Sequence, residues 1–237
     1  MLKKILVLLA TVLGGVSFLY ASKTCVLDTP TTAILSSGSY SADVRYFSHG
    51  NIISEINFGV FKSLDLGVSW EIDKFIGNKN IKAVVPALHV KLRLYGGSMT
   101  LPGFALGYDG QGTFINRDSD GGCGYMQRYK GLYFVIGREF FVEGLIFNLG
   151  INMNDFSKPK IYWFLNATSP LYKEFVSFML EYDNVNYFPN ARLNCGLRFS
   201  VTEYLDIDCF VRDCWGKKDT KRVPSERLLR ISYLGKF

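Results

Sequence analysis

The stretch ARLNCGLRFSV, residues 191–201, alternates apolar and polar side chains without a break. A period of two is typical of a β-strand, in which successive side chains point to opposite faces, and it fits no helix. The stretch therefore predicts a strand with two unlike faces. The apolar face carries Ala191, Leu193, Cys195, Leu197, Phe199 and Val201, and the polar face carries Arg192, Asn194, Gly196, Arg198 and Ser200.

The same alternation recurs along the chain from residue 39 onward, in about twelve segments. A soluble β-sandwich alternates as well, with its apolar face turned inward, so the period alone does not choose between a sandwich and a barrel. The segments lie near residues 39–47, 52–61, 64–73, 87–95, 102–109, 129–138, 143–153, 160–168, 174–183, 191–201, 204–212 and 228–237.

The connections between these segments differ in length in a regular way. When the strands are counted upward from the periplasm, every long connection falls on the outer side and the inner connections stay short. Transmembrane barrels show this asymmetry, and an even number of strands leaves both chain ends in the periplasm. The pattern favours a barrel over a sandwich. The three longest connections are DKFIGNKNIKAVVP, DGQGTFINRDSDGGCGYMQR and DCWGKKDTKRVPSE.

The N-terminus has the layout of a secretory signal peptide. Lys3 and Lys4 precede an apolar run over residues 5–20, and the small residue Ala21 follows. A membrane anchor is the alternative, although the apolar run is short for one. We expect a signal peptide over residues 1–21, a periplasmic lead-in over residues 22–38, and a barrel over residues 39–237.

The chain ends on LRISYLGKF, residues 229–237, and this ending resembles the C-terminal signal of bacterial outer-membrane barrels. Leu229, Ile231, Tyr233 and Phe237 carry the resemblance, and Gly235 departs from it because a bulkier residue is usual there. The resemblance implies that the barrel assembly machinery reads Phe237. Because only a closed sheet satisfies its backbone groups in lipid, the last strand should pair with the first.

The predicted fold is therefore all-β: an antiparallel transmembrane β-barrel of about 12 strands that follows a signal peptide. Its expected location is the outer membrane of a Gram-negative bacterium, where its outer surface would contact lipid and lipopolysaccharide. The positive charges that give the net charge of +6 are mostly spread singly along the chain, so we expect no nucleic-acid partner.

Charged side chains on the polar faces should point into the lumen. They either line a narrow aqueous path for a charged or sugar-like solute, or pair with one another and fill the interior. The candidates are Glu71, Asp73, His89, Lys91, Arg93, Arg192, Arg198, Asp206 and Asp208.

The tight turn after residue 201 suggests a register for the two strands beside it. Matching apolar residues across the turn sets Arg198 opposite Asp206 and Cys195 opposite Cys209. The two cysteines would then form a disulfide in an oxidising compartment, or remain as two small apolar thiols.

We expect no enzymatic activity, metal or cofactor. The chain has two histidines, His49 and His89, and no Cys-x-x-Cys motif, which argues against a zinc site. Barrel enzymes of the lipase and deacylase types place a histidine beside a serine, and neither histidine has the sequence context of those enzymes.

Three stretches resemble the YjbH-type family of bacterial barrel proteins, which is associated with exopolysaccharide production. They are TTAILSSGSYSADVRYF at 31–47, ALGYDGQG at 105–112 and LNCGLRFSVTEYLDID at 193–208. The resemblance implies an outer-membrane barrel linked to polysaccharide secretion, and it supplies no catalytic residues. Asp109 and Gln111, where the longest outer loop begins, are the candidate glycan contacts.

The leading functional hypothesis is a non-enzymatic barrel that supports surface polysaccharide export or envelope structure. A narrow channel for small charged or sugar-like solutes is the alternative. A barrel enzyme that modifies lipids is a more distant one.

Overall fold

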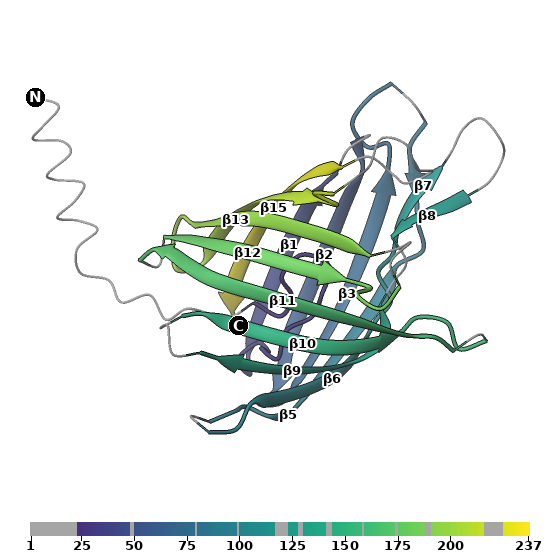
Figure 1. Cartoon of the computed structure of the whole chain (residues 1–237). Coiled ribbons are helices and arrows are strands. Elements are labelled where there is room, and N and C mark those ends of the chain that lie inside the picture. Colours follow the sequence, from purple (N-terminus) through teal and green to yellow (C-terminus); the bar gives the residue numbers. More distant parts are fainter. Residues whose placement is uncertain are drawn as a thin grey trace, which may run out of the picture.

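The alternating segments fold as antiparallel strands, each paired with its neighbours, in the computed structural model (Figure 1). The structure describes residues 23–47, 50–78, 80–98, 100–116, 123–127, 130–140, 144–157, 159–173, 175–187, 191–215 and 225–237, with only the backbone for 113–116 and 123–127. No helix in this described part is long and apolar enough to cross a membrane.

Twelve strands form the wall, in positions close to the predicted ones. They are β1 (Ser39–Tyr46), β2 (Ile52–Phe61), β3 (Leu64–Asp73), β5 (Ala87–Tyr95), β6 (Gly103–Asp109), β9 (Gly131–Glu139), β10 (Ile146–Met153), β11 (Ile161–Tyr172), β12 (Val176–Asp183), β13 (Arg192–Ser200), β14 (Leu205–Arg212) and β15 (Glu226–Lys236). Three short strands lie in the outer loops: β4 (Lys82–Ala83) extends the sheet beside β3, and β7 (Thr113–Asn116) pairs with β8 (Cys123–Gln127).

The sheet closes where the last strand meets the first. β1 pairs with β2 on one side and with β15 on the other, from Ser39 opposite Lys236 to Tyr46 opposite Leu229. The final residue continues this pairing, since the Phe237 backbone N–H donates to the Gly38 carbonyl at 3.0 Å. The predicted pairing of the chain ends is confirmed, and the barrel is closed.

Gly235, the residue that departs from the usual ending, has a packing reason. It lies opposite Tyr40, and the Tyr40 ring covers it so closely that a Cβ on Gly235 would come within 2.4 Å of the ring. An aromatic ring that shields a strand glycine is a known way to pin the pairing of two strands. The glycine therefore belongs to the seam that closes the barrel.

The polarity of the barrel is inverted relative to a soluble protein. Trp70 and Trp163 are 50% and 46% exposed on the outer surface, whereas most of the charged side chains of the wall are buried inside. This is the arrangement of a barrel whose outer face meets lipid. Other exposed apolar residues are Leu66, Leu88, Leu149, Phe199 and Val211, and the buried polar ones include Asp65, Asn148, Asn166, Glu181 and Arg230.

The register of β13 against β14 differs from the predicted one by two residues. A shift of two keeps every side chain on its own face, so the alternation does not distinguish the two registers. The turn does: Val201 pairs with Leu205 through a backbone bond of 2.9 Å, and the Thr202 hydroxyl accepts from the Leu205 N–H at 3.0 Å. The observed pairs include Cys195 with Val211, Leu197 with Cys209, Arg198 with Asp208 and Ser200 with Asp206.

The predicted opposition of Cys195 and Cys209 is therefore wrong, and the Cys195–Cys209 disulfide loses its basis. Both residues are free thiols in the structure, and Cys209 is exposed on the outer face opposite Leu197. The same correction applies to Arg198, which lies opposite Asp208 instead of Asp206.

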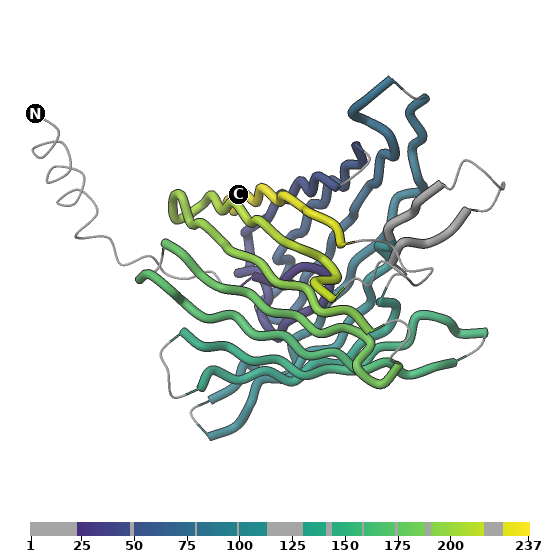
Figure 2. Tube along the Cα trace, turned by 45° about the horizontal axis from the view of Figure 1, so that its top comes forward, coloured from purple at the N-terminus to yellow at the C-terminus, as the bar shows by residue number. Residues whose placement is uncertain are grey.

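The lead-in before β1 lies inside the barrel, whereas the sequence suggested a periplasmic segment. In Figure 2 the purple segment that follows the N-terminal trace runs within the ring of strands. Its backbone bonds to side chains of opposite walls, such as Glu181 of β12 and Asp65 of β3. We call residues 23–35 the plug. The expected signal peptide, residues 1–21, lies outside the described residues.

Candidate functional site, the closed interior of the barrel

Glu181 holds the middle of the plug. One carboxylate oxygen accepts from the backbone N–H groups of Leu27, Asp28 and Thr29 at 3.2, 3.0 and 2.8 Å, and from the Thr29 hydroxyl at 2.7 Å. Successive backbone N–H groups that converge in this way form an anion-binding nest, and bonds to a charged acceptor are the strong ones. Glu181 is 1% exposed, so these bonds form away from bulk water.

Three asparagines extend this contact across neighbouring strands. Asn148, Asn166, Glu181 and Asn194 lie directly opposite one another on β10 to β13, and all four are buried. The Asn166 amide donates to the Thr29 hydroxyl at 2.9 Å and to the Pro30 carbonyl at 3.1 Å. The Asn148 side-chain carbonyl accepts from the Thr32 N–H at 3.2 Å. We call these four residues the polar ladder.

The plug also has an apolar anchor. Val26 and Leu27 are 2% and 0% exposed and belong to one buried cluster with inward-facing apolar residues of the wall. Burying such a side chain contributes about 1.5–3 kcal/mol. The wall residues of this cluster are Phe47, Ile53, Met179, Phe210 and Leu228.

Asp28 links the plug to two arginines of the wall. Its carboxylate accepts from Arg212 at 2.9 Å and lies 3.9 Å from Arg45. Although burial opposes ionisation, Arg212 and Arg45 hold the pKa of Asp28 below its usual value. Arg212 also pairs with Glu226 at 2.9 Å, and Arg45 pairs with Glu55 at 3.0 Å.

The two ends of the plug contact the opposite wall. The Lys91 ammonium donates to the carbonyls of Thr24 and Ala33, the second at 3.1 Å. The Asp65 carboxylate accepts from the Leu35 N–H at 3.0 Å. Lys91, which the sequence predicted as a charged residue of the lumen, therefore binds backbone carbonyls of the plug and helps to hold the plug in place.

A compact charge cluster lies toward the inner end. Asp208 accepts from Arg198 at 2.9 Å and from Arg230 at 2.8 Å, on the strands to either side of it. Asp206 pairs with Lys23 of the plug at 3.2 Å. The predicted lumen residues Arg198, Asp206 and Asp208 are thus brought together, and they form part of one network of opposite charges.

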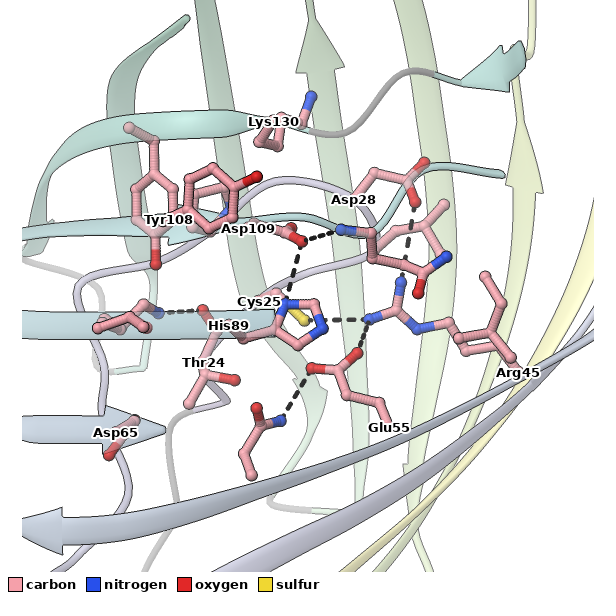
Figure 3. Close-up of a pocket in the computed structure, with 18 residues that line it drawn as sticks. Thr24, Cys25, Asp28, Arg45, Glu55, Asp65, His89, Tyr108, Asp109 and Lys130 are labelled. Atoms are coloured by element: carbon pink, nitrogen blue, oxygen red, sulfur yellow. Dashed lines mark hydrogen bonds and ion pairs between the residues drawn. The ribbon is translucent and has the colours of Figure 1, made fainter. Parts of the chain in front are cut away.

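A polar cavity of about 70 Å³ remains between the plug and the wall formed by β1, β2, β3, β5, β6 and β9 (Figure 3). In Figure 3 the Arg45 guanidinium lies between Glu55 and Asp28, and the His89 ring lies beside Asp109. The volume suffices for a few water molecules between the plug and the charged wall.

His89 lies in a Ser-His-Asp arrangement. Its Nδ1 is 3.1 Å from Asp109 Oδ1, and its Nε2 is 2.7 Å from the Ser69 hydroxyl, which also bonds to the Gln111 side chain. The distances suit a catalytic triad. However, Ser69 is 1% exposed, is capped by Gln111 and is not among the residues lining the cavity. The arrangement is a hydrogen-bond chain that runs from β3 to the base of the outer loop.

The remaining predicted lumen residues lie at different heights of the barrel. Glu71 and Asp73 are buried on the inner face of β3. Arg192 lies opposite Asp183 near the outer end. Arg93 lies near the inner end, where it donates to the Lys62 carbonyl at 3.3 Å. Arg93 therefore lies at the opposite end of the barrel from the other three side chains.

The predicted loop contacts have separate outcomes. Asp109 and Gln111 line the cavity, and their role as glycan contacts stays a prediction. His49 falls outside the described residues.

The asparagines of the polar ladder and the plug itself were missed by sequence reasoning. Asn148, Asn166 and Asn194 occupy the inward positions of three alternating strands, a signal that was available in the sequence. The plug has no period, so nothing in residues 23–35 indicates where they lie.

Comparisons with known proteins concern the fold alone. No protein-family model matches the chain, and no curated protein matches it. Among solved structures it is similar to the KdgM porin, at 11% identity and a TM-score of 0.47, over 82% of this chain and 98% of that one. The fold is that of an outer-membrane β-barrel. The closed sheet, the polar interior and the apolar exterior decide this.

Two further solved structures are more distant. An OmpF of Salmonella typhi, in complex with daunomycin, has 7% identity and a TM-score of 0.35, over 83% of this chain and 96% of that one. The N-terminal β-barrel domain of OprF from Pseudomonas aeruginosa has 9% identity and a TM-score of 0.26, over 85% of this chain and all of that domain. None of these likenesses bears on the solute, the partner or the role of this chain.

Proposed function

We propose that the protein is a non-enzymatic barrel of the outer membrane of a Gram-negative bacterium, closed by its own N-terminal segment, that supports surface polysaccharide export or envelope structure. The observation that carries the closed barrel is the plug, bound at its middle by Glu181 and at its ends by Lys91 and Asp65. The polysaccharide role rests on the resemblance of the sequence to the YjbH-type family.

Aromatic side chains support the membrane location. At the inner end of the barrel, pairs of rings from nearby parts of the wall lie at centroid distances of 6.2–6.4 Å. Outer-membrane barrels carry such girdles where the apolar band meets the headgroups. The pairs are Tyr40–Tyr233, Phe58–Phe237, Tyr95–Phe104 and Phe140–Phe147.

Fractionation tests the location. The protein should separate with the outer membrane, and its mobility on gels should change on boiling, as it does for stable closed barrels. Recovery with the soluble periplasmic proteins, together with a mobility that boiling does not alter, would contradict the proposal.

A deletion strain tests the role. Loss of the protein should reduce surface polysaccharide, and reintroduction of the wild-type chain should restore it. Unchanged polysaccharide in the deletion strain, with unchanged envelope integrity under detergent stress, would contradict the proposed role and leave the barrel itself intact.

A narrow channel is the second candidate, because a specific observation favours it. Much of the wall behind the plug is polar, and several contacts of the plug with it are hydrogen bonds and ion pairs that a rearrangement can exchange for water. Planar-bilayer recordings separate the two candidates: the closed barrel predicts no conductance steps, and regular steps from the wild-type protein favour the channel.

A further inference from the structure

Two cysteines at the outer end of the barrel lie in direct contact. The Sγ atoms of Cys195 on β13 and Cys214, just after β14, are 3.0 Å apart. Even carbon atoms rest about 3.5–4.0 Å apart when they are in contact, so the two sulfurs are closer than packing alone would place them. An approach of about 1 Å would bring them to the length of a disulfide bond.

The local backbone explains this contact. Asp213 adopts a φ of 54°, in the left-handed region, and turns the chain at the end of β14. Its N–H donates to the Asn194 side chain at 2.9 Å, and the N–H of Cys214 donates to the Leu193 carbonyl at 2.7 Å. These two bonds fix Cys214 against β13 beside Cys195. The contact is therefore set by paired backbone and buried side chains.

The other cysteines with described side chains have no such neighbour. Cys25 lies in the plug, where its sulfur accepts from Arg45 and Arg230 at 3.6 and 3.7 Å. Cys209 is exposed on the outer face opposite Leu197. The fifth cysteine, Cys123, belongs to the part of the chain whose side chains are not described.

We propose that Cys195 and Cys214 form a disulfide that clamps the outer end of β14 to β13. Each thiol loses its proton, the two sulfurs form one bond, and the two electrons reduce a disulfide oxidant of the exporting compartment to its dithiol. The exchange proceeds through a mixed disulfide with that oxidant. The inference uses the export proposed above only to supply the oxidant.

The environment of Cys214 bears on when the bond forms. Burial and the neighbouring Cys195 thiol raise the pKa of Cys214 to about 11, so little thiolate is present at neutral pH once the barrel has folded. Because the thiolate is the species that attacks a disulfide, oxidation is expected in the unfolded chain before the sheet closes.

The clamp would act on the site that holds the plug. Cys214 is two residues beyond Arg212, whose guanidinium binds Asp28 of the plug and Glu226 of β15. The Asp213 carbonyl accepts from the Ser225 hydroxyl at 2.9 Å, so both ends of the long outer loop meet at this point. A covalent link here holds the strand end that presents Arg212 to the plug.

Mass spectrometry of the folded protein tests the pairing. Purified full-length mature protein is unfolded in urea, refolded in detergent with reduced and oxidised glutathione, denatured again with alkylation of free thiols, and digested without reduction. At an oxidising poise we expect a linked Cys195–Cys214 peptide, together with alkylated Cys209. Protein extracted from outer membranes and treated in the same way should already carry the link.

Two matched variants keep the test decisive. Cys209→Ser should retain the link, and Cys195→Ser should lose it and leave Cys214 alkylated. Alkylation of both Cys195 and Cys214 at every oxidising poise, or a link from Cys214 to Cys123, would overturn the proposal. A link that forms with glutathione but is absent from cells would uphold the pairing and count against export to an oxidising compartment.

Discussion

The two sides of the lumen hold the plug in different ways. On one side, β10 to β13 present the polar ladder, whose amides and single carboxylate bind residues 27–32 directly. On the other side, Lys91 and Asp65 hold the ends of the plug, Arg45 lies 3.9 Å from Asp28, and a cavity of about 70 Å³ lies between the middle of the plug and the rest of the charged wall. The comparison teaches that the plug is anchored on one wall, and that any opening should begin at the other.

The largest expected effect comes from the anchored wall. Glu181→Ala removes four bonds from the plug, and at about 1.5 kcal/mol for each bond to a charged acceptor the loss approaches about 6 kcal/mol. The barrel should remain closed as a sheet while the plug leaves, so planar-bilayer recordings should show conductance steps. Glu203→Ala, in an exposed turn, is the matched control and should stay silent. Equal silence of both variants would show that Glu181 is not the anchor.

A smaller effect is expected when Arg212, which binds Asp28 of the plug, is replaced. Arg212→Met keeps the aliphatic stem but removes the guanidinium that both Asp28 and Glu226 bind, and breaking a buried pair costs about 3 kcal/mol. The variant should unfold at a lower urea concentration in detergent, as followed by tryptophan fluorescence. The double variant Arg212→Met with Glu226→Gln should recover part of this loss, because it also removes one of the two buried negative charges that Arg212 offsets. A double variant less stable than the single one would contradict the assignment.

Substitutions in the wall that lines the cavity should have small effects on stability. His89→Ala removes one hydrogen bond to Asp109 and one to Ser69, which is worth about 1 kcal/mol each. We expect a modest loss of stability, no conductance and no change in envelope lipid composition. Altered lipid composition in both His89→Ala and Ser69→Ala strains, with normal amounts of folded protein, would instead show that the Ser-His-Asp chain is catalytic.

The smallest effect concerns the register. Leu197→Cys, in a Cys195→Ser background, places a thiol opposite Cys209 on the outer face. The two should become linked on oxidation, whereas restoring Cys195 and keeping Leu197 should give no link to Cys209. A Cys195–Cys209 link in the wild-type protein would contradict the observed register and support the one predicted from the sequence, in which these two cysteines lie opposite each other.

Much of the fold follows from the alternation of side chains. The strands near residues 52–61 and 64–73 are predicted to the residue, and the closure of β15 on β1 follows from the backbone's need for partners in lipid. The register of β13 on β14 did not follow, because a slip of two residues preserves both faces. The pairing of β7 with β8 was not predicted, because the sequence analysis assigned this segment to a long connection.

The sequence predicted which side chains point into the barrel, but not which groups they bind there. The alternation places Glu71, Lys91 and Asp208 inside, as observed. It does not indicate that Lys91 binds carbonyls of residues 24 and 33, since those contacts join segments far apart in sequence. The plug depends on shape and on buried hydrogen bonds, and neither leaves a periodic trace in the chain.

The central claim is that residues 23–35 close the lumen. The most direct measurement compares single-channel conductance of the mature wild-type protein with that of a variant that lacks these residues, after heat-modifiable gel mobility has shown that both barrels are folded. The account predicts a silent wild type and regular conductance steps from the deletion variant. Equal conductance of the two folded proteins, or silence of both, would contradict it.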